Sequence, residues 1–83
     1  MAHFIEEDKE ILKKLGARIR RLRKEKGFSS HETFAYQHEI SRGLYGKYER
    51  GENDLRFLSL LKILNALDIS LKDFFQKDLI LTK

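Results

Sequence analysis

Cationic side chains are the most conspicuous source of binding chemistry in this sequence. Between Lys13 and Lys26 the chain is dense in lysine and arginine, and Glu25 is the one acidic residue of that stretch. Acidic residues gather instead between Glu6 and Glu10. This segregation concentrates positive potential on one segment, which favours a polyanionic partner. The alternative is that these charges only keep one face of a helix hydrated.

Histidine and glutamate offer a second possible chemistry, the binding of a metal ion. His31 and His38 are separated by seven positions and Glu39 follows, so they lack the spacing of three or four that pairs ligands on one helix face. We therefore interpret them as surface polar residues and expect no metal and no cofactor. The sequence also has no cysteine, no glycine-rich phosphate loop and no recognisable serine–histidine motif, so we do not expect an enzyme.

The composition is that of a small globular protein. The chain has 83 residues, of which 41% are hydrophobic and 36% charged, and its formal net charge is +4. Its pI is near 9.5. This length suits one compact domain and leaves no room for a separate catalytic domain. No apolar run approaches the length of a membrane span, and residues 1–10 do not resemble a signal peptide, so we expect a cytoplasmic protein.

The elements that must position these side chains are all predicted to be helices. Leucine and isoleucine recur at three and four residues in the first long segment, which predicts an amphipathic helix over about residues 8–26. Gly27 ends it, because glycine takes the left-handed cap conformation without steric cost. A second helix begins at Ser29 or Ser30, buries Phe34 and Ala35, and ends near Gln37 or His38.

A third short helix is predicted to begin at Ser41, a good N-cap residue, and to end at Gly51. Tyr45 and Tyr48 follow at the spacing that turns both side chains inward. A fourth helix provides the hydrophobic centre of the domain through five residues that recur at helical spacing: Phe57, Leu60, Leu61, Leu64 and Leu67.

Ser70 and Asp73 have the spacing of another N-terminal cap, so a short fifth helix with Leu71, Phe74 and Phe75 should seal the core. The whole chain is then one domain. Residues 1–10 form an N-terminal extension and the start of the first helix, residues 11–76 form the helical bundle, and residues 77–83 form a tail.

Three segments of this sequence carry a resemblance to a known family. The runs LGARIRRLRKEKGFS, ISRGLYGKYERG and LLKILNALDISLKDFF resemble the lambda-repressor and Cro family, also called the Xre type, over roughly residues 15–75. The ERG at Glu49 to Gly51 and the LDIS segment are the most specific parts. The resemblance implies a compact all-α bundle of five helices, in which the second and third form a helix-turn-helix and the third enters the major groove of DNA.

The resemblance also implies which residues face the bases. Arg42, Gly43 and Lys47 match positions directed at base edges, and Leu44 lies at the margin of that surface. Arginine can donate two hydrogen bonds to a guanine, and a leucine can contact a thymine methyl group. An isolated exposed leucine is equally well explained without DNA. We interpret Gly43 as a residue that lets the helix backbone approach the groove closely, and Gly46 as a residue that packs tightly under the second helix.

Contacts to the DNA backbone are expected around the two ends of this motif. His31 matches a position that often carries a phosphate-binding glutamine, and the other candidates for phosphate contact are Ser30, Arg50, Asn53 and Arg56. In this family the glutamate of the third helix usually pairs with a basic residue of the first helix. Arg23 and Glu49 are therefore interpreted as a structural ion pair that contacts no base.

Three departures from the family pattern concern the turn between the motif helices. There is one apparent extra residue between Gly27 and the second helix, Glu39 replaces a turn glycine, and His38 occupies a position that is usually aliphatic. If His38 and Glu39 continued the second helix, the angle between the motif helices would change. The set of base-facing residues could then shift.

These observations predict a sequence-specific DNA-binding transcriptional regulator that acts on a palindromic operator. A homodimer is expected, because one such module buries little DNA. Its predicted interface is the hydrophobic end of the chain around Phe74, Phe75, Leu79 and Ile80. The alternative function is that of an antitoxin or adaptor whose main partner is a toxin or another protein, since a fold does not settle a function.

Overall fold

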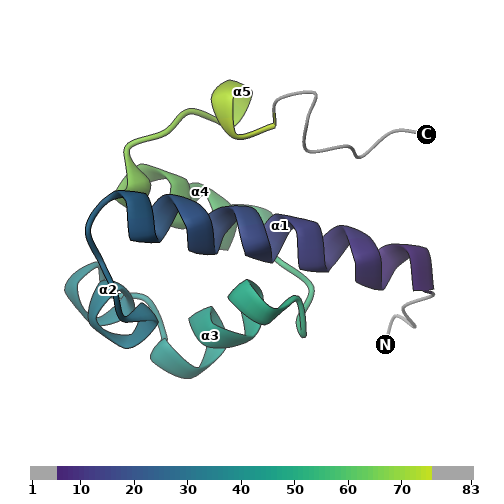
Figure 1. Cartoon of the computed structure of the whole chain (residues 1–83), viewed down its shortest axis with the longest axis horizontal. Helices are drawn as coiled ribbons and strands as arrows, with labels where there is room; N and C mark the ends of the chain where they lie inside the picture. The colour runs from purple at the N-terminus through teal and green to yellow at the C-terminus, as the bar shows by residue number, and fades with distance from the viewer. Residues whose placement is uncertain (1–5, 76–83) are drawn as a thin grey trace.

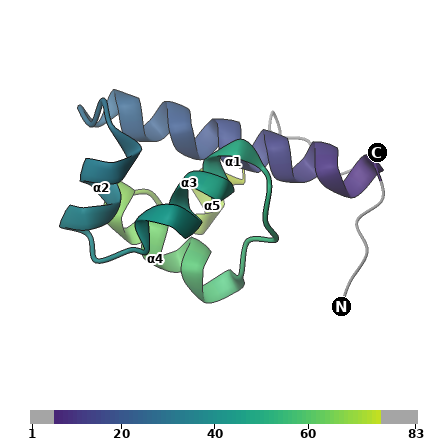
Figure 2. The ribbon, with the colours of Figure 1, turned by 90° about the horizontal axis from the view of Figure 1, so that it is seen from below.

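The computed structural model describes residues 6–75, and these form five helices and no strand. The helices are α1 (Glu6–Glu25), α2 (His31–Gln37), α3 (Arg42–Arg50), α4 (Phe57–Leu67) and α5 (Leu71–Phe74). Figure 1 shows α2 and α3 on the opposite side of α1 from α5. Figure 2 shows the same helices from below, with α2 and α3 toward the viewer. The predicted all-α architecture with five helices is confirmed.

The first helix has the charge pattern that stabilises both of its ends. Acidic residues occupy its first turn and Arg23 and Lys24 its last, which complements the helix dipole. Gly27 follows at φ +103°. The amides of Gly27 and Phe28 then donate to the carbonyls of Lys24 and Arg23, which closes the helix end. The predicted stop at Gly27 is confirmed.

The turn between α2 and α3 forms without glycine. Ser30 begins α2, because its hydroxyl accepts a hydrogen bond from the Thr33 amide at 3.3 Å. The helix ends at Gln37, and Glu39 then takes the left-handed conformation at φ 57°. Lys62 of α4 donates to the carbonyl oxygen of Glu39 at 2.8 Å and holds the turn from outside. The second helix therefore does not continue through Glu39, and the motif keeps its turn.

Both ends of α3 lie where the sequence predicted them. Ser41 directly precedes the helix, although its side chain makes no capping hydrogen bond, so its expected contribution as an N-cap is absent. Gly51 ends α3 in the left-handed conformation at φ 71°.

Ser70 caps α5 as predicted, since its hydroxyl accepts a hydrogen bond from the Asp73 amide at 3.0 Å.

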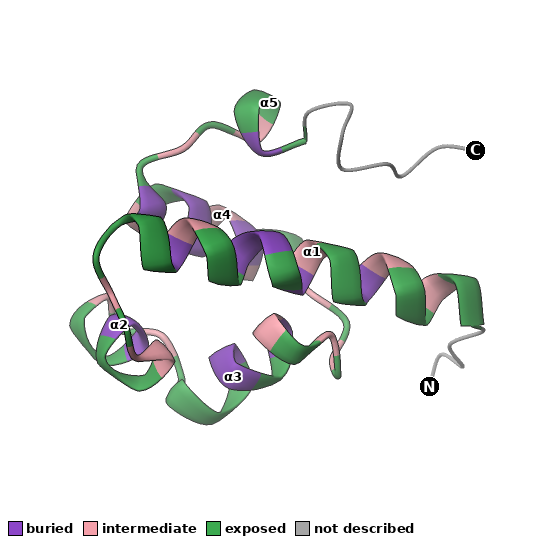
Figure 3. Ribbon diagram, viewed as in Figure 1, coloured by how far each residue is buried: buried purple, intermediate pink, exposed green. Residues whose placement is uncertain are grey.

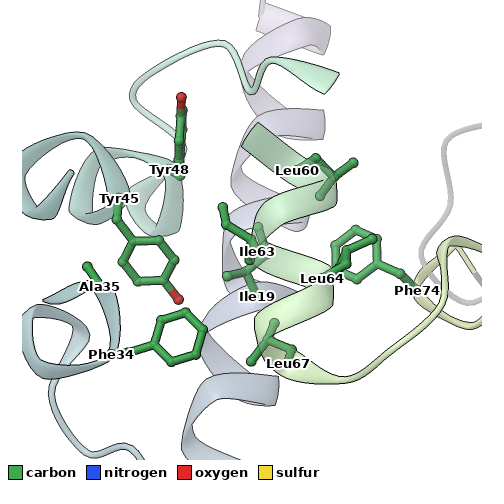
Figure 4. Close-up of a cluster of buried hydrophobic side chains, with 10 residues drawn as sticks. All are labelled: Ile19, Phe34, Ala35, Tyr45, Tyr48, Leu60, Ile63, Leu64, Leu67 and Phe74. Atoms are coloured by element: carbon green, nitrogen blue, oxygen red, sulfur yellow. The ribbon is translucent and has the colours of Figure 1, made fainter. Parts of the chain in front are cut away.

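All five helices contribute to one hydrophobic core, which Figure 4 shows in close-up. Its fully or almost fully buried members are Ile19, Phe34, Ala35, Tyr45, Tyr48, Leu60, Ile63, Leu64, Leu67 and Phe74. The inward orientation of both tyrosines is confirmed. The α5 residue Phe74 is held against α1 by Arg18, whose guanidinium carbon lies 5.9 Å from the centre of the ring.

Two aromatic residues that the sequence placed in this core are exposed. Phe57 is 61% exposed and Phe75 is 37% exposed. The buried stripe of α4 consists of Leu60, Ile63, Leu64 and Leu67, and at about 100° per residue Phe57 is rotated away from its centre by roughly 70°. Phe75 follows the last residue of α5, so only Phe74 of this pair seals the core.

His38 is not the surface polar residue that its type suggested. It is half-buried, and its ring lies 4.8 Å from that of Phe34 and 5.8 Å from that of Phe28. Its Nε2 atom is buried and has no hydrogen-bond partner within residues 6–75. His38 therefore takes the packing role of the usual aliphatic residue, and the loop residue Phe28 covers it.

Candidate nucleic-acid interface

The third helix presents one face to solvent and the other to the core. Tyr45, Gly46 and Tyr48 are buried. The four residues predicted to face base edges are all exposed: Arg42, Gly43, Leu44 and Lys47. Figure 3 shows both exposed and buried segments along α3. A β-carbon at Gly43 would meet nothing within 4 Å, so the helix backbone itself is open to a close approach there. The structure thus brings the predicted residues to one outer surface.

Arg42 has an aromatic neighbour that its sequence pattern did not predict. The guanidinium carbon of Arg42 lies 6.0 Å from the ring centre of Tyr36 on α2. The two side chains line a shallow hollow together with Glu32, Thr33 and Gln37. Tyr36 was missed because its position on α2 carries no hydrophobic periodicity that distinguishes it from a surface residue.

A second hollow, which we call the basic hollow, lies between α1, α2 and α3. Its lining residues are Arg20, Arg23, Lys24, Ser29, Ser30, His31, Gly46, Glu49 and Arg50. Three of the predicted phosphate-contact residues, Ser30, His31 and Arg50, therefore share one site. Arg20 and Lys24 join them from α1, and their spacing of four residues on one helix face was the available signal.

Gly46 lines the basic hollow beside His31 and Arg50. An ideal β-carbon at this position would lie 3.1 Å from Nε2 of His31 and 3.2 Å from Nη1 of Arg50. These distances are tighter than ordinary van der Waals contact, so any larger residue would push the two side chains apart. The predicted packing of Gly46 under α2 is the arrangement seen here, and it lets His31 and Arg50 converge.

A buried ion pair joins α1 to α3 behind this surface. Nε of Arg23 donates to Glu49 at 2.7 Å and Nη2 donates to its other carboxylate oxygen at 3.1 Å. Nη1 of Arg23 donates to the carbonyl of Phe28 at 2.6 Å. Both side chains are almost fully buried, and the hydrogen bonding of Arg23 to the Glu49 carboxylate raises the pKa of Arg23. Each of these donors already makes a hydrogen bond within the protein, so the pair is not available to a DNA base.

The remaining predicted phosphate-contact residues lie outside the basic hollow. Asn53 is half-buried in the loop after α3, and Arg56 is exposed directly before α4. Arg50 itself pairs with Glu52 at 3.0 Å on the surface. That pairing raises the pKa of Arg50 and lowers the pKa of Glu52. Asn53 and Arg56 therefore lie apart from the cations that line the basic hollow.

Neither a metal centre nor a membrane segment is found in the described part of the chain. Residues 6–75 contain no group of three or more histidine, cysteine or carboxylate side chains able to hold a metal ion. None of the helices there is long and apolar enough to cross a bilayer.

Comparison with known proteins identifies this arrangement of helices. A family model described as helix-turn-helix matches residues 19–74. The chain belongs to the Xre-type helix-turn-helix family. Within this family the motif consists of α2 and α3, and the protein is a DNA-binding transcriptional regulator. The family recognised from the sequence is thereby confirmed.

Individual relatives are similar over most of their length. The control protein C.MunI from Mycoplasma sp is 36% identical over 62 residues, which make up 75% of this chain and 84% of that protein. The crystal structure of the restriction-modification controller protein C.AhdI from Aeromonas hydrophila is 39% identical with a TM-score of 0.70, covering 77% of this chain and 96% of that one.

A point mutant of the restriction-modification controller protein C.Esp1396I extends the structural similarity further along the chain. It is 30% identical to this chain, with a TM-score of 0.72. The match covers 95% of this chain and 90% of that one. The observed order and packing of the helices are therefore those of solved controller proteins.

Proposed function

We propose that this regulator controls the transcription of a restriction–modification system by placing α3 in the major groove of a palindromic operator. The observation that carries the proposal is the exposed face of α3, where Arg42, Gly43, Leu44 and Lys47 have no role in the core. Its similarity at 36–39% identity to named control and controller proteins supports the choice of system.

Each of these residues has a distinct task at the base edges. Arg42 is the first residue of α3, and its guanidinium can donate to O6 and N7 of one guanine, worth roughly 1–3 kcal/mol of discrimination. Lys47 reaches a base or a phosphate further along the groove. Leu44 contacts a thymine methyl group, and Gly43 allows the helix backbone to approach the DNA closely.

The basic hollow binds a phosphate of the DNA backbone in this proposal. His31 and Arg50 approach it from the motif helices, Arg20 and Lys24 approach it from α1, and Ser30 lies at its edge. Asn53 and Arg56, between α3 and α4, contact the backbone outside that hollow. Such contacts set the register of the protein on the duplex and carry no sequence information.

The experiment that tests this function is fluorescence anisotropy with the DNA upstream of the protein's own gene and with a scrambled duplex. We expect the native duplex to bind about a thousandfold more tightly. Arg42→Ala should abolish that preference, whereas Lys47→Ala should weaken it only partly. Equal and weak binding of both duplexes, lost together as salt is added, would overturn the proposal in favour of a non-specific electrostatic surface.

A homodimer is part of the proposal, and of the interface residues predicted from the sequence Phe75 is 37% exposed whereas Phe74 is not. Phe74 is completely buried within one chain, so it is not available to a second copy. Leu79 and Ile80 lie outside the described residues. The large exposed hydrophobic residues of α4 are Phe57 and Leu58, which are 61% and 77% exposed. We propose that a second copy of the chain covers this surface at the start of α4.

The comparisons do not favour the alternative function as an antitoxin or adaptor. The relatives reported above are named as control and controller proteins, and DNA is the partner that the exposed cations of α3 suit. A gene for a restriction enzyme or methyltransferase beside this one supports the proposal, whereas a toxin gene there argues against it. We propose a cytoplasmic location, where a DNA-binding regulator can reach its operator.

A further inference from the structure

Tyr36 is a large aromatic residue that contributes little to the core. Its neighbours Phe34 and Ala35 fill the buried face of α2, while Tyr36 itself is 73% exposed. A single exposed aromatic residue is unremarkable on its own. What distinguishes Tyr36 is its place beside Arg42, across the hollow that separates α2 from the start of α3.

The contact between these two side chains has the geometry of a cation–π interaction. The guanidinium carbon of Arg42 lies 6.0 Å from the ring centre of Tyr36, at the outer limit of such contacts. Within residues 6–75 no carboxylate forms an ion pair with Arg42. Arg23 and Arg50 are different, because Nε and Nη2 of Arg23 donate to Glu49 and Nε of Arg50 donates to Glu52.

The difference between a ring and a carboxylate matters for the binding of a base. A carboxylate accepts hydrogen bonds from the N–H groups at the edge of the guanidinium. A guanine requires those same N–H donors. An aromatic ring attracts the cation through its face and accepts none of those hydrogen bonds. Tyr36 therefore restrains Arg42 and leaves its donors free.

Restraint of this kind favours binding because the side chain then loses less conformational entropy when the complex forms. A free arginine side chain samples many rotamers, and their loss opposes binding. We propose that Tyr36 is a positioning residue that holds the Arg42 guanidinium ready for a base edge. The inference rests on the proposed function, and it gives α2 a part in sequence discrimination without any contact to a base.

The test is a double-mutant cycle measured by anisotropy on the native and scrambled duplexes. Tyr36→Ala should weaken binding of the native duplex about two- to fivefold, the size expected of an exposed cation–π contact, and should leave the scrambled duplex unaffected. Tyr36→Phe should retain native affinity, because it keeps the ring face. Gln37→Ala, which lines the same hollow without a ring, is the matched control and should change nothing.

The decisive comparison is Tyr36→Ala made in the Arg42→Ala background. The inference predicts no further loss of affinity there, since Tyr36 acts only through Arg42. An equal loss in both backgrounds, or a loss in Tyr36→Phe as large as in Tyr36→Ala, would overturn it and indicate that the tyrosine contacts the DNA itself. Full specificity in Arg42→Ala alone would instead overturn the proposed role of Arg42, so the two failures are distinguishable.

A measurement on the free protein supplies a second readout. The ring of Tyr36 shifts the NMR resonances of the Arg42 side chain if the two remain in contact in solution. Those resonances should move toward random-coil values in Tyr36→Ala and stay in place in Tyr36→Phe and Gln37→Ala. Resonances that do not move in Tyr36→Ala would overturn the inference even if DNA affinity falls.

Discussion

The buried ion pair between Arg23 and Glu49 connects α1 to α3 through one side chain from each helix. Removing one partner leaves the other charge buried and unpaired, which costs about 3–5 kcal/mol. We predict a loss of this order in the free energy of unfolding for Glu49→Gln, measured by chemical denaturation with circular dichroism. The matched control is Glu52→Gln, because the exposed Arg50–Glu52 pair should contribute about 0–1 kcal/mol. Equal effects of the two substitutions would contradict this assignment.

Tyr45 adds a dependence on alkaline pH to the same region. Burial raises the pKa of its hydroxyl, and the Glu49 carboxylate raises it further. The folded protein thus keeps the proton while an unfolded tyrosine loses it near pH 10, so this contribution to stability is complete below pH 10 and falls above it. The stability of wild type relative to Tyr45→Phe should fall by about 1.4 kcal/mol per pH unit above pH 10. Parallel pH profiles of the two proteins would contradict the prediction.

At the scale of helices, the crossing of α1 over α3 depends on a glycine. A β-carbon at Gly16 would lie 2.5 Å from the carbonyl oxygen of Glu49 and closer still to that of Tyr48. Both obstacles are backbone atoms, so the helices themselves would have to separate. We predict that Gly16→Ala lowers the free energy of unfolding by about 3 kcal/mol or more.

The control for this crossing is Gly43→Ala in α3. Its β-carbon would meet open space, so higher helix propensity should raise the stability by up to about 1 kcal/mol. Thermal unfolding of both variants gives the comparison. A Gly16→Ala protein as stable as wild type would show that the helices do not cross as closely as described.

The basic hollow is also a property of elements, because three helices supply its cations. Replacing one phosphate contact should reduce the slope of log affinity against log salt by about one, on native and scrambled duplexes alike. We predict this reduction for Arg20→Gln. Arg21→Gln is the control on the same helix, since Arg21 pairs with Glu25 at 3.7 Å and does not line the hollow. An unchanged slope for Arg20→Gln would exclude it from the phosphate site.

The helices could be predicted from sequence where a local signal was strong. Periodic leucines and isoleucines gave α1 and α4, and Gly27 and Gly51 marked two helix ends by their conformational freedom. Glu39 could not be predicted in the left-handed conformation, because the interaction that holds it, the hydrogen bond from Lys62, comes from another helix. Phe57 was placed in the core because periodicity alone does not fix how far a buried stripe is rotated.

The site could be predicted only in part for the same reason. Family resemblance predicted Arg42 and Lys47 as base-reading residues, and both are exposed on α3. The convergence of Arg20 and Lys24 on His31 depends on how α1 lies against α2 and α3, which no local pattern encodes. The contact between Tyr36 and Arg42 likewise spans the turn between two helices.

At the scale of the whole molecule, one chain offers a single α3 to DNA, whereas a palindromic operator presents two half-sites about 34–36 Å apart. Two copies related by a two-fold axis would match that symmetry. The apolar surface that remains exposed at the start of α4 includes Phe57 and Leu58, and covering it removes apolar area from water. The same contact would therefore stabilise the dimer and fix the spacing of its two recognition helices.

Leu58→Glu tests this arrangement because Leu58 is 77% exposed and its replacement leaves the core intact. A charge at the proposed interface should convert the dimer to a monomer in sedimentation velocity and weaken binding to the full operator, while affinity for one half-site is retained. Phe75→Glu is the control at the C-terminal surface favoured by the sequence, and it should remain dimeric. A dimer lost in Phe75→Glu but kept in Leu58→Glu would move the interface to α5, and a monomeric wild type at high concentration would remove the dimer altogether.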